Sequence, residues 1–115
     1  MEKRDKNNRF RIDVDLPNKV FRLDGKSMRL EKCLVDAEKT DLDDGDTVLT
    51  LTYNGRRNKA GDYPAVRERD KLEKKYGDRI SAEAYGEEGD RAYISGDCEN
   101  TLAIIGRFDA YINRE

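Results

Sequence analysis

Histidine and cysteine, which commonly act as nucleophiles, general bases or metal ligands, are scarce in this chain. Its 115 residues include no histidine and only two cysteines, Cys33 and Cys98. Without histidine, Ser–His and Cys–His nucleophile pairs and histidine-bound zinc or iron sites are excluded. Cys98 stands at the expected start of a helix, where the helix dipole activates a thiol, but Asp97 and Glu99 flank it and oppose that effect. We therefore expect structural thiols, reduced in the simplest case and joined in a disulfide as the lesser alternative, and no cofactor. A catalytic pair among the 25 carboxylates is not excluded, but the sequence does not single one out, so we expect no enzymatic activity.

A run of aspartates in residues 38–46 calls for a test of metal binding, because carboxylate oxygens are good ligands for calcium and magnesium. These aspartates are Asp41, Asp43, Asp44 and Asp46. An EF-hand loop needs glycine at its sixth position and glutamate at its twelfth, and counting from Asp41 places Asp46 and Thr52 there. We interpret the segment as a solvated acidic loop that binds no metal.

Basic residues offer a second kind of chemistry, the binding of phosphate groups or of acidic protein surfaces. The net charge of −2 is the difference between 23 basic and 25 acidic residues. The distribution of these charges over the surface therefore decides which partners the protein attracts. The candidate partner-binding residues are Lys3, Arg4, Lys6, Arg9, Lys26, Arg56, Arg57 and Lys59.

Alternating apolar residues predict the sheet that would position these side chains. Residues 9–16 alternate as a strand with one solvated face does. The pair Asp24-Gly25 lies between two alternating runs and favours a type I′ hairpin, which pairs Leu23 with Lys26 and Phe21 with Met28. We expect the second arm of this hairpin to continue through Val35.

A fourth strand is predicted for residues 47–53, with a turn at Asn54-Gly55 after it. In a simple four-strand meander, the start of the first strand, the hairpin tip and the end of the fourth strand lie on one rim. The eight candidate residues would then gather at that rim, and the acidic loop would lie at the opposite one.

The second half of the chain is predicted to hold two helices and a hairpin. Pro64 and Gly77 bound a charged surface helix over residues 64–76, with Ala65, Leu72 and Tyr76 as its apolar stripe. Residues 80–85 and 91–95 resemble a second hairpin. We expect a strongly amphipathic helix over residues 98–113, with Asp97 as its N-cap.

The expected fold class is therefore α+β, in the order ββββαββα, with a mainly antiparallel sheet and the C-terminal helix packed on one of its faces. The more charged helix is expected to be exposed. Residues 1–8 are expected to form a flexible polar arm, and residues 9–115 a single domain. The longest apolar run is the four residues Leu102–Ile105, so we expect no membrane span. The start of the sequence has no apolar stretch of the kind a secretory signal needs, so we expect a cytoplasmic protein.

These expectations favour a non-catalytic binding module that docks on a macromolecular partner, with a protein as the favoured partner. Base rates for small proteins of this kind suggest an accessory or inhibitor factor from a phage or mobile element. The alternative is a nucleic-acid-binding protein that uses the basic rim. A metal-dependent hydrolase built on the acidic loop is the least favoured function. Strand pairing at a sheet edge would allow dimers, and the oligomeric state stays open.

Overall fold

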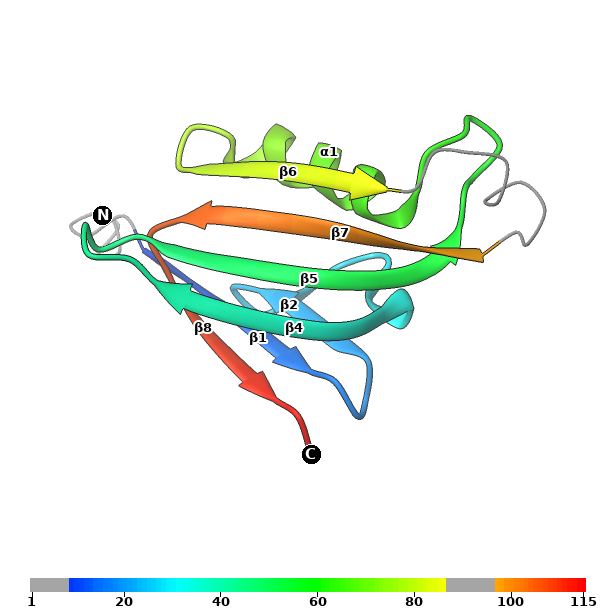
Figure 1. The fold of residues 1–115 in the computed structure, drawn as a ribbon. Coiled ribbons are helices and arrows are strands. Elements are labelled where there is room, and N and C mark those ends of the chain that lie inside the picture. The colour runs from blue at the N-terminus through cyan, green and yellow to red at the C-terminus, as the bar shows by residue number, and fades with distance from the viewer. Residues whose placement is uncertain (1–8, 87–96) are drawn as a thin grey trace.

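The computed structural model of the chain describes residues 9–86 and 97–115, which form two four-stranded sheets and one α-helix (Figure 1). The first sheet has the order β3-β2-β1-β8 and the second the order β4-β5-β7-β6. The strands are β1(Phe10–Asp15), β2(Val20–Leu23), β3(Lys26–Ser27), β4(Leu34–Asp41), β5(Thr47–Arg56), β6(Ile80–Gly86), β7(Asp97–Gly106) and β8(Phe108–Asn113). The helices are α1(Pro64–Tyr76) and the short 3₁₀ helix η2(Glu31–Cys33). The structure is therefore α+β and mainly antiparallel, with β1 and β8 as a parallel pair.

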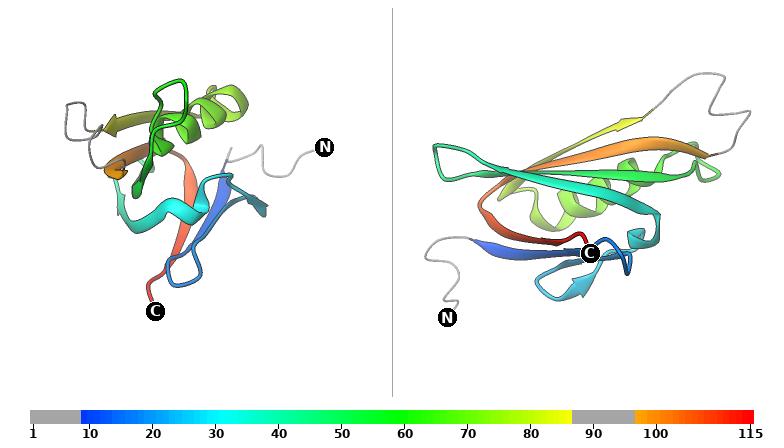
Figure 2. Two further views of the ribbon diagram at one scale, coloured as in Figure 1. Left: turned by 90° about the vertical axis from the view of Figure 1, so that its right-hand side faces the viewer. Right: turned by 60° about the horizontal axis from the view of Figure 1, so that its bottom comes forward.

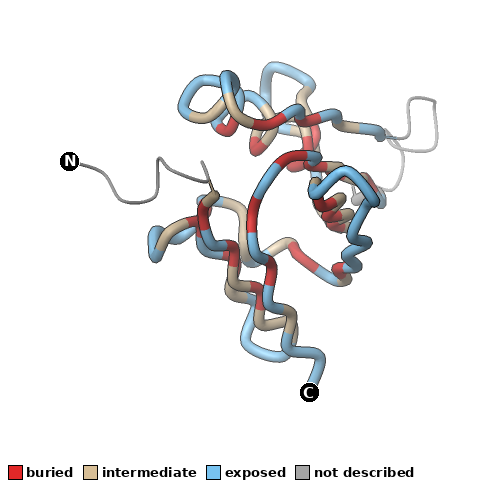
Figure 3. The backbone as a smooth tube through the Cα atoms, turned by 90° about the vertical axis from the view of Figure 1, so that its left-hand side faces the viewer, coloured by how far each residue is buried: buried red, intermediate tan, exposed pale blue. Residues whose placement is uncertain are grey.

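The two sheets face each other and share the buried side chains between them (Figure 2). In most strands every second residue points inward, which gives the alternation of buried and exposed positions along the chain (Figure 3). Phe21 of the first sheet and Leu51 and Ile104 of the second belong to this core. Helix α1 packs against β5, β6 and β7 and adds Ala65 and Leu72 to the same core.

The prediction of a C-terminal helix over residues 98–113 is wrong, since these residues form β7 and β8. Leu102, Ile104, Phe108 and Ala110 are buried, and Ile105, Asp109 and Tyr111, each next to a buried residue, are exposed. This period of two belongs to a strand. Leu102, Ile105, Phe108 and Ile112 also fit a helical spacing, which is why the sequence pattern was ambiguous.

The hairpin at Asp24-Gly25 is confirmed. Both residues have positive φ, 48° and 84°, as a type I′ turn requires, and Leu23 pairs with Lys26. The N–H of Met28 donates to the carbonyl of Phe21 at 2.8 Å. The predicted continuation of this arm through Val35 is wrong. Strand β3 ends at Ser27, and the chain crosses through η2 to β4 in the other sheet, so the four-strand meander does not form.

Strand β5 is confirmed, but it runs on to Arg56, and the predicted turn at Asn54-Gly55 is wrong. Strand β7 pairs with β5 along its whole length, up to Arg56. Asn54 and Gly55 therefore continue the strand and do not form a turn. A Cβ atom on Gly55 would lie 3.0 Å from Cγ of Pro64 and 3.2 Å from Sγ of Cys33. Gly55 therefore lies in a closely packed strand and not in a turn.

The helix over residues 64–76 is confirmed with its predicted ends, and Pro64 occupies its first turn. The first arm of the second predicted hairpin is β6, and its second arm, residues 91–95, lies outside the described part of the chain, as does the predicted polar arm of residues 1–8. Within the described residues, no helix is long and apolar enough to cross a membrane.

Candidate binding sites

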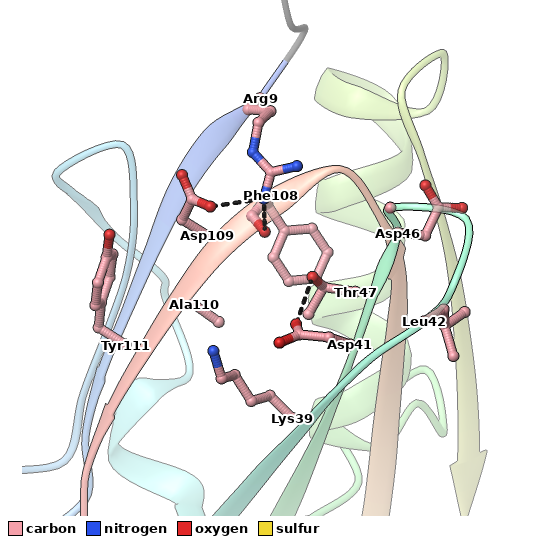
Figure 4. Close-up of a pocket in the computed structure, with 11 residues that line it drawn as sticks. Arg9, Lys39, Asp41, Leu42, Asp46, Thr47, Phe108, Asp109, Ala110 and Tyr111 are labelled. Atoms are coloured by element: carbon pink, nitrogen blue, oxygen red, sulfur yellow. Dashed lines mark hydrogen bonds and ion pairs between the residues drawn. The ribbon is translucent and has the colours of Figure 1, made fainter.

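A polar pocket lies where the second sheet passes into the first. Strand β7 ends at Gly106 and β8 begins at Phe108, so the chain turns from one sheet to the other within two residues. The tip of the β4–β5 hairpin lies beside this corner and leaves a pocket of about 240 Å³ (Figure 4). Its lining residues are Arg9, Lys39, Asp41, Leu42, Gly45, Asp46, Thr47, Phe108, Asp109, Ala110 and Tyr111.

The pocket contains charges of both signs, most of them paired. The guanidinium of Arg9 donates to Asp109 at 2.6 Å and to the carbonyl of Phe108 at 3.0 Å. The hydrogen bond to Asp109 is the main reason why the pKa of Arg9 is raised above its ordinary value. Asp41 accepts a hydrogen bond from Thr47 at 3.1 Å. Lys39 points from β4 toward Ala110 of β8 (Figure 4), and no described residue forms a hydrogen bond or ion pair with its ammonium group.

One wall of the pocket is the free edge of β4, the outermost strand of its sheet. Side chains cap the N-terminal part of this edge. Lys19 donates to the carbonyl of Leu34 at 2.8 Å, and Arg114 donates to the carbonyl of Ala37. The N–H of Ala37 donates to the carboxylate of Asp36 at 2.8 Å. The first half of the edge is thereby protected from pairing with another strand.

The second half of the β4 edge is open at the pocket. The N–H of Leu42 donates to the carbonyl of Asp46 at 2.8 Å, which fixes the alternation of hydrogen-bonded and non-bonded pairs along the hairpin. Lys39 and Asp41 therefore direct their backbone N–H and C=O groups away from β5. No described residue forms a backbone hydrogen bond with either of them on that side.

A second hollow, of about 120 Å³, lies between α1 and the β2–β3 hairpin. Its apolar wall consists of Leu23, Met28, Leu72 and Tyr76. Ser27 and three lysines complete the lining, and no carboxylate among the described residues is part of it. The lysines are Lys26, Lys71 and Lys75. We call this site the lysine hollow.

The geometry of α1 and of the hairpin tip explains the lysine hollow. Leu72 and Tyr76 lie four residues apart on α1, as do Lys71 and Lys75, so each pair shares one side of the helix. The type I′ turn brings Lys26 back beside this side of α1. Glu68, which would have diluted the positive charge of the helix, points inward and is only 1% exposed.

The structure does not bring the described members of the predicted basic rim together. Arg9 lies in the polar pocket beside the acidic loop, which was expected at the opposite rim, and Lys26 lies in the lysine hollow. Arg56 is nine residues beyond Thr47 on β5, which places it about 30 Å from the pocket. Arg57 and Lys59 follow at that distant end. Lys3, Arg4 and Lys6 lie outside the described residues.

Sequence reasoning missed Lys39, Lys71 and Lys75 as members of sites. The repeated pair of a lysine and an apolar residue, Lys71-Leu72 and Lys75-Tyr76, was a visible signal for the lysine hollow. No such signal marked Lys39, whose surroundings depend on the contact between the two sheets. In residues 9–86 and 97–115, no group of three or more acidic or cysteine side chains is arranged to hold a metal ion.

Comparisons of the chain with protein-family models, with curated proteins and with solved structures found no match.

Proposed function

We propose that this chain is a non-catalytic binding module that takes up an extended segment of a protein partner along β4. The observation that carries the proposal is the open half of the β4 edge, where Lys39 and Asp41 present their backbone groups to a pocket. An added strand would satisfy these groups with main-chain hydrogen bonds, as in other cases of strand addition.

The surroundings of this edge suit a peptide. Side chains of an added strand would alternate between the pocket and solvent. Inside the pocket they would meet the ammonium group of Lys39 and the carboxylates of Asp41 and Asp46. Exposed Leu42 and Tyr111, at 40% and 52%, offer apolar contacts beside these charges. Capping by Lys19 and Arg114 limits the site to the second half of β4, so the bound segment is short.

Proline at position 39 tests the proposal, because it removes one outward N–H and leaves the hydrogen bonds between β4 and β5 in place. We would capture partners from a cell extract with the wild-type chain and with the Lys39→Pro and Lys39→Ala variants. The expected result is at least a tenfold loss of the captured protein with Lys39→Pro and a smaller loss with Lys39→Ala. Equal capture by Lys39→Pro and the wild type, with both folded, would overturn strand addition.

Nucleic acid is the second candidate partner. Arg56 is the last residue of β5, Arg57 and Lys59 follow it in the chain, and the guanidinium of Arg57 lies 5.8 Å from the ring centre of Tyr63. Labelled random DNA and RNA, titrated with the chain at two salt concentrations, test this function. Binding that weakens steeply with salt and is lost when Arg56, Arg57 and Lys59 become glutamate would support it. No binding at low salt would overturn it. The role of accessory or inhibitor factor stays a prediction from the sequence.

A further inference from the structure

We propose that the lysine hollow binds a small amphiphilic anion, namely an aromatic or short aliphatic group that carries a phosphate or carboxylate. The site is separate from the β4 edge. It lies between α1 and the β2–β3 hairpin, and none of its lining residues belongs to the polar pocket.

The floor of the hollow is apolar and already held in place by the core. Leu23 and Leu72 are each 1% exposed, and Met28 is 6% exposed. All three belong to the hydrophobic core, and their packing in the core holds them in place. Tyr76 stacks on Phe10 with a distance of 5.2 Å between ring centres, which holds the tyrosine ring at the edge of the hollow. An apolar cavity of about 150 Å³ accommodates benzene. The hollow, at about 120 Å³ and partly open, is therefore of a size for one ring or a short chain.

The rim of the hollow is cationic. Among the described residues, no hydrogen bond or ion pair involves the ammonium groups of Lys26, Lys71 or Lys75. Three like charges around one hollow raise the local potential, and an anion held between them would be stabilised by charge-assisted hydrogen bonds. The rim and the floor together select a ligand with both an anionic head and an apolar body.

Two carboxylates on the elements that form the hollow have hydrogen-bond partners elsewhere. Glu68 of α1 is buried and accepts a hydrogen bond from the N–H of Leu30 at 3.1 Å. Asp24, in the hairpin turn, accepts one from the N–H of Arg11 at 3.0 Å. Neither residue lines the hollow. Lys71 interacts electrostatically with Glu68, but among the described residues neither carboxylate forms an ion pair with a lysine of the hollow. The three ammonium groups can therefore still form hydrogen bonds with a ligand from solution.

Phenyl phosphate is a suitable first probe, and nuclear magnetic resonance titration of the whole chain measures its binding residue by residue. Phenyl phosphate should shift the methyl signals of Met28 and Leu72. Inorganic phosphate, which lacks the apolar body, and benzylamine, which carries the opposite charge, should each bind at least tenfold more weakly. Benzoate in a parallel titration distinguishes a carboxylate site from a phosphate site.

The lysines are tested by the double variant Lys26→Gln with Lys75→Gln. It should bind phenyl phosphate at least tenfold more weakly than the wild type. Lys74→Gln is the matched control, because Lys74 is an exposed lysine on the same helix that does not line the hollow. All substituted residues are exposed, so the variants should keep the wild-type spectrum elsewhere. Equal binding of phenyl and inorganic phosphate, or no effect of the double variant, would overturn the proposal.

Discussion

The carboxylate of Glu68 accepts a hydrogen bond from the backbone N–H of Leu30 at 3.1 Å, inside the protein. This bond ties α1 to the segment that carries the chain from the first sheet to the second. Burial raises the pKa of Glu68 above its ordinary value, and the bond from Leu30 opposes that rise without cancelling it. Glu68 is thus an ionisable residue of α1 that lies in the protein interior and forms a hydrogen bond there.

Stability should fall as pH rises through the range in which Glu68 ionises. Its pKa is higher in the folded chain than in the unfolded chain, so the folded state favours the protonated form. The resulting stabilisation is fully present below the unfolded pKa and is lost as pH rises through the folded pKa. Glu68→Gln removes this ionisation and keeps an oxygen that can accept from Leu30. Urea unfolding of both proteins between pH 4 and pH 8 should show the advantage of the variant growing with pH.

Glu68→Ala is the control for the hydrogen bond itself. It leaves the Leu30 N–H without its acceptor and creates a small void, which should lower the free energy of unfolding by about 1–3 kcal/mol relative to Glu68→Gln. If the alanine and glutamine variants were equally stable at pH 7, the bond to Leu30 would have no role in holding α1.

Tyr53→Phe should leave the chain as stable or make it more stable. Tyr53 is fully buried on β5, and its hydroxyl has no hydrogen-bond partner among the described residues. Removing a buried hydroxyl without a partner avoids a desolvation cost of about 1–3 kcal/mol. Urea unfolding at pH 7 measures the change in the free energy of unfolding. A loss of more than 1 kcal/mol would contradict the structure at this position, since it would reveal a partner of the hydroxyl.

Two glycines should respond to substitution for different reasons. Gly25 has φ of 84° and no atom within 4 Å of an added Cβ, so Gly25→Ala should cost about 1–2 kcal/mol through backbone strain alone. Gly25→Asn should recover part of that cost, because asparagine tolerates this conformation. A Cβ on Gly106 would lie 2.6 Å from Cγ2 of Ile80. Alanine there should cost about 1–3 kcal/mol through overpacking, and asparagine, being larger, should cost more. Thermal unfolding of the four variants checks this contrast.

The sequence supported those parts of the fold that depend on local chemistry. The Asp24-Gly25 turn, the alternation in β1 and the helix that begins at Pro64 were all predicted, because each depends on neighbours in the chain. The strand β7 was not, since its apolar residues fit both a helix and a strand until β5 and β6 are known to flank it. Such long-range pairing decides between two local patterns of similar strength.

The candidate sites were harder to predict than the fold. Lys26 and Arg9 were identified among the basic residues, but the meander that would have gathered them with Arg56 does not form. The free edge beside Lys39 exists because β3 ends after two residues and the chain crosses to a second sheet. No pattern within residues 34–41 indicates that crossing.

The measurement that tests strand addition most directly is backbone amide hydrogen exchange in β4, with and without the captured partner. In the free chain, the amides of Glu38 and Thr40 should be protected by β5, and those of Lys39 and Asp41 should exchange quickly. Binding of the partner should slow exchange at Lys39 and Asp41 selectively. A complex in which both amides still exchange quickly would contradict the account, because the partner would then bind without pairing to β4.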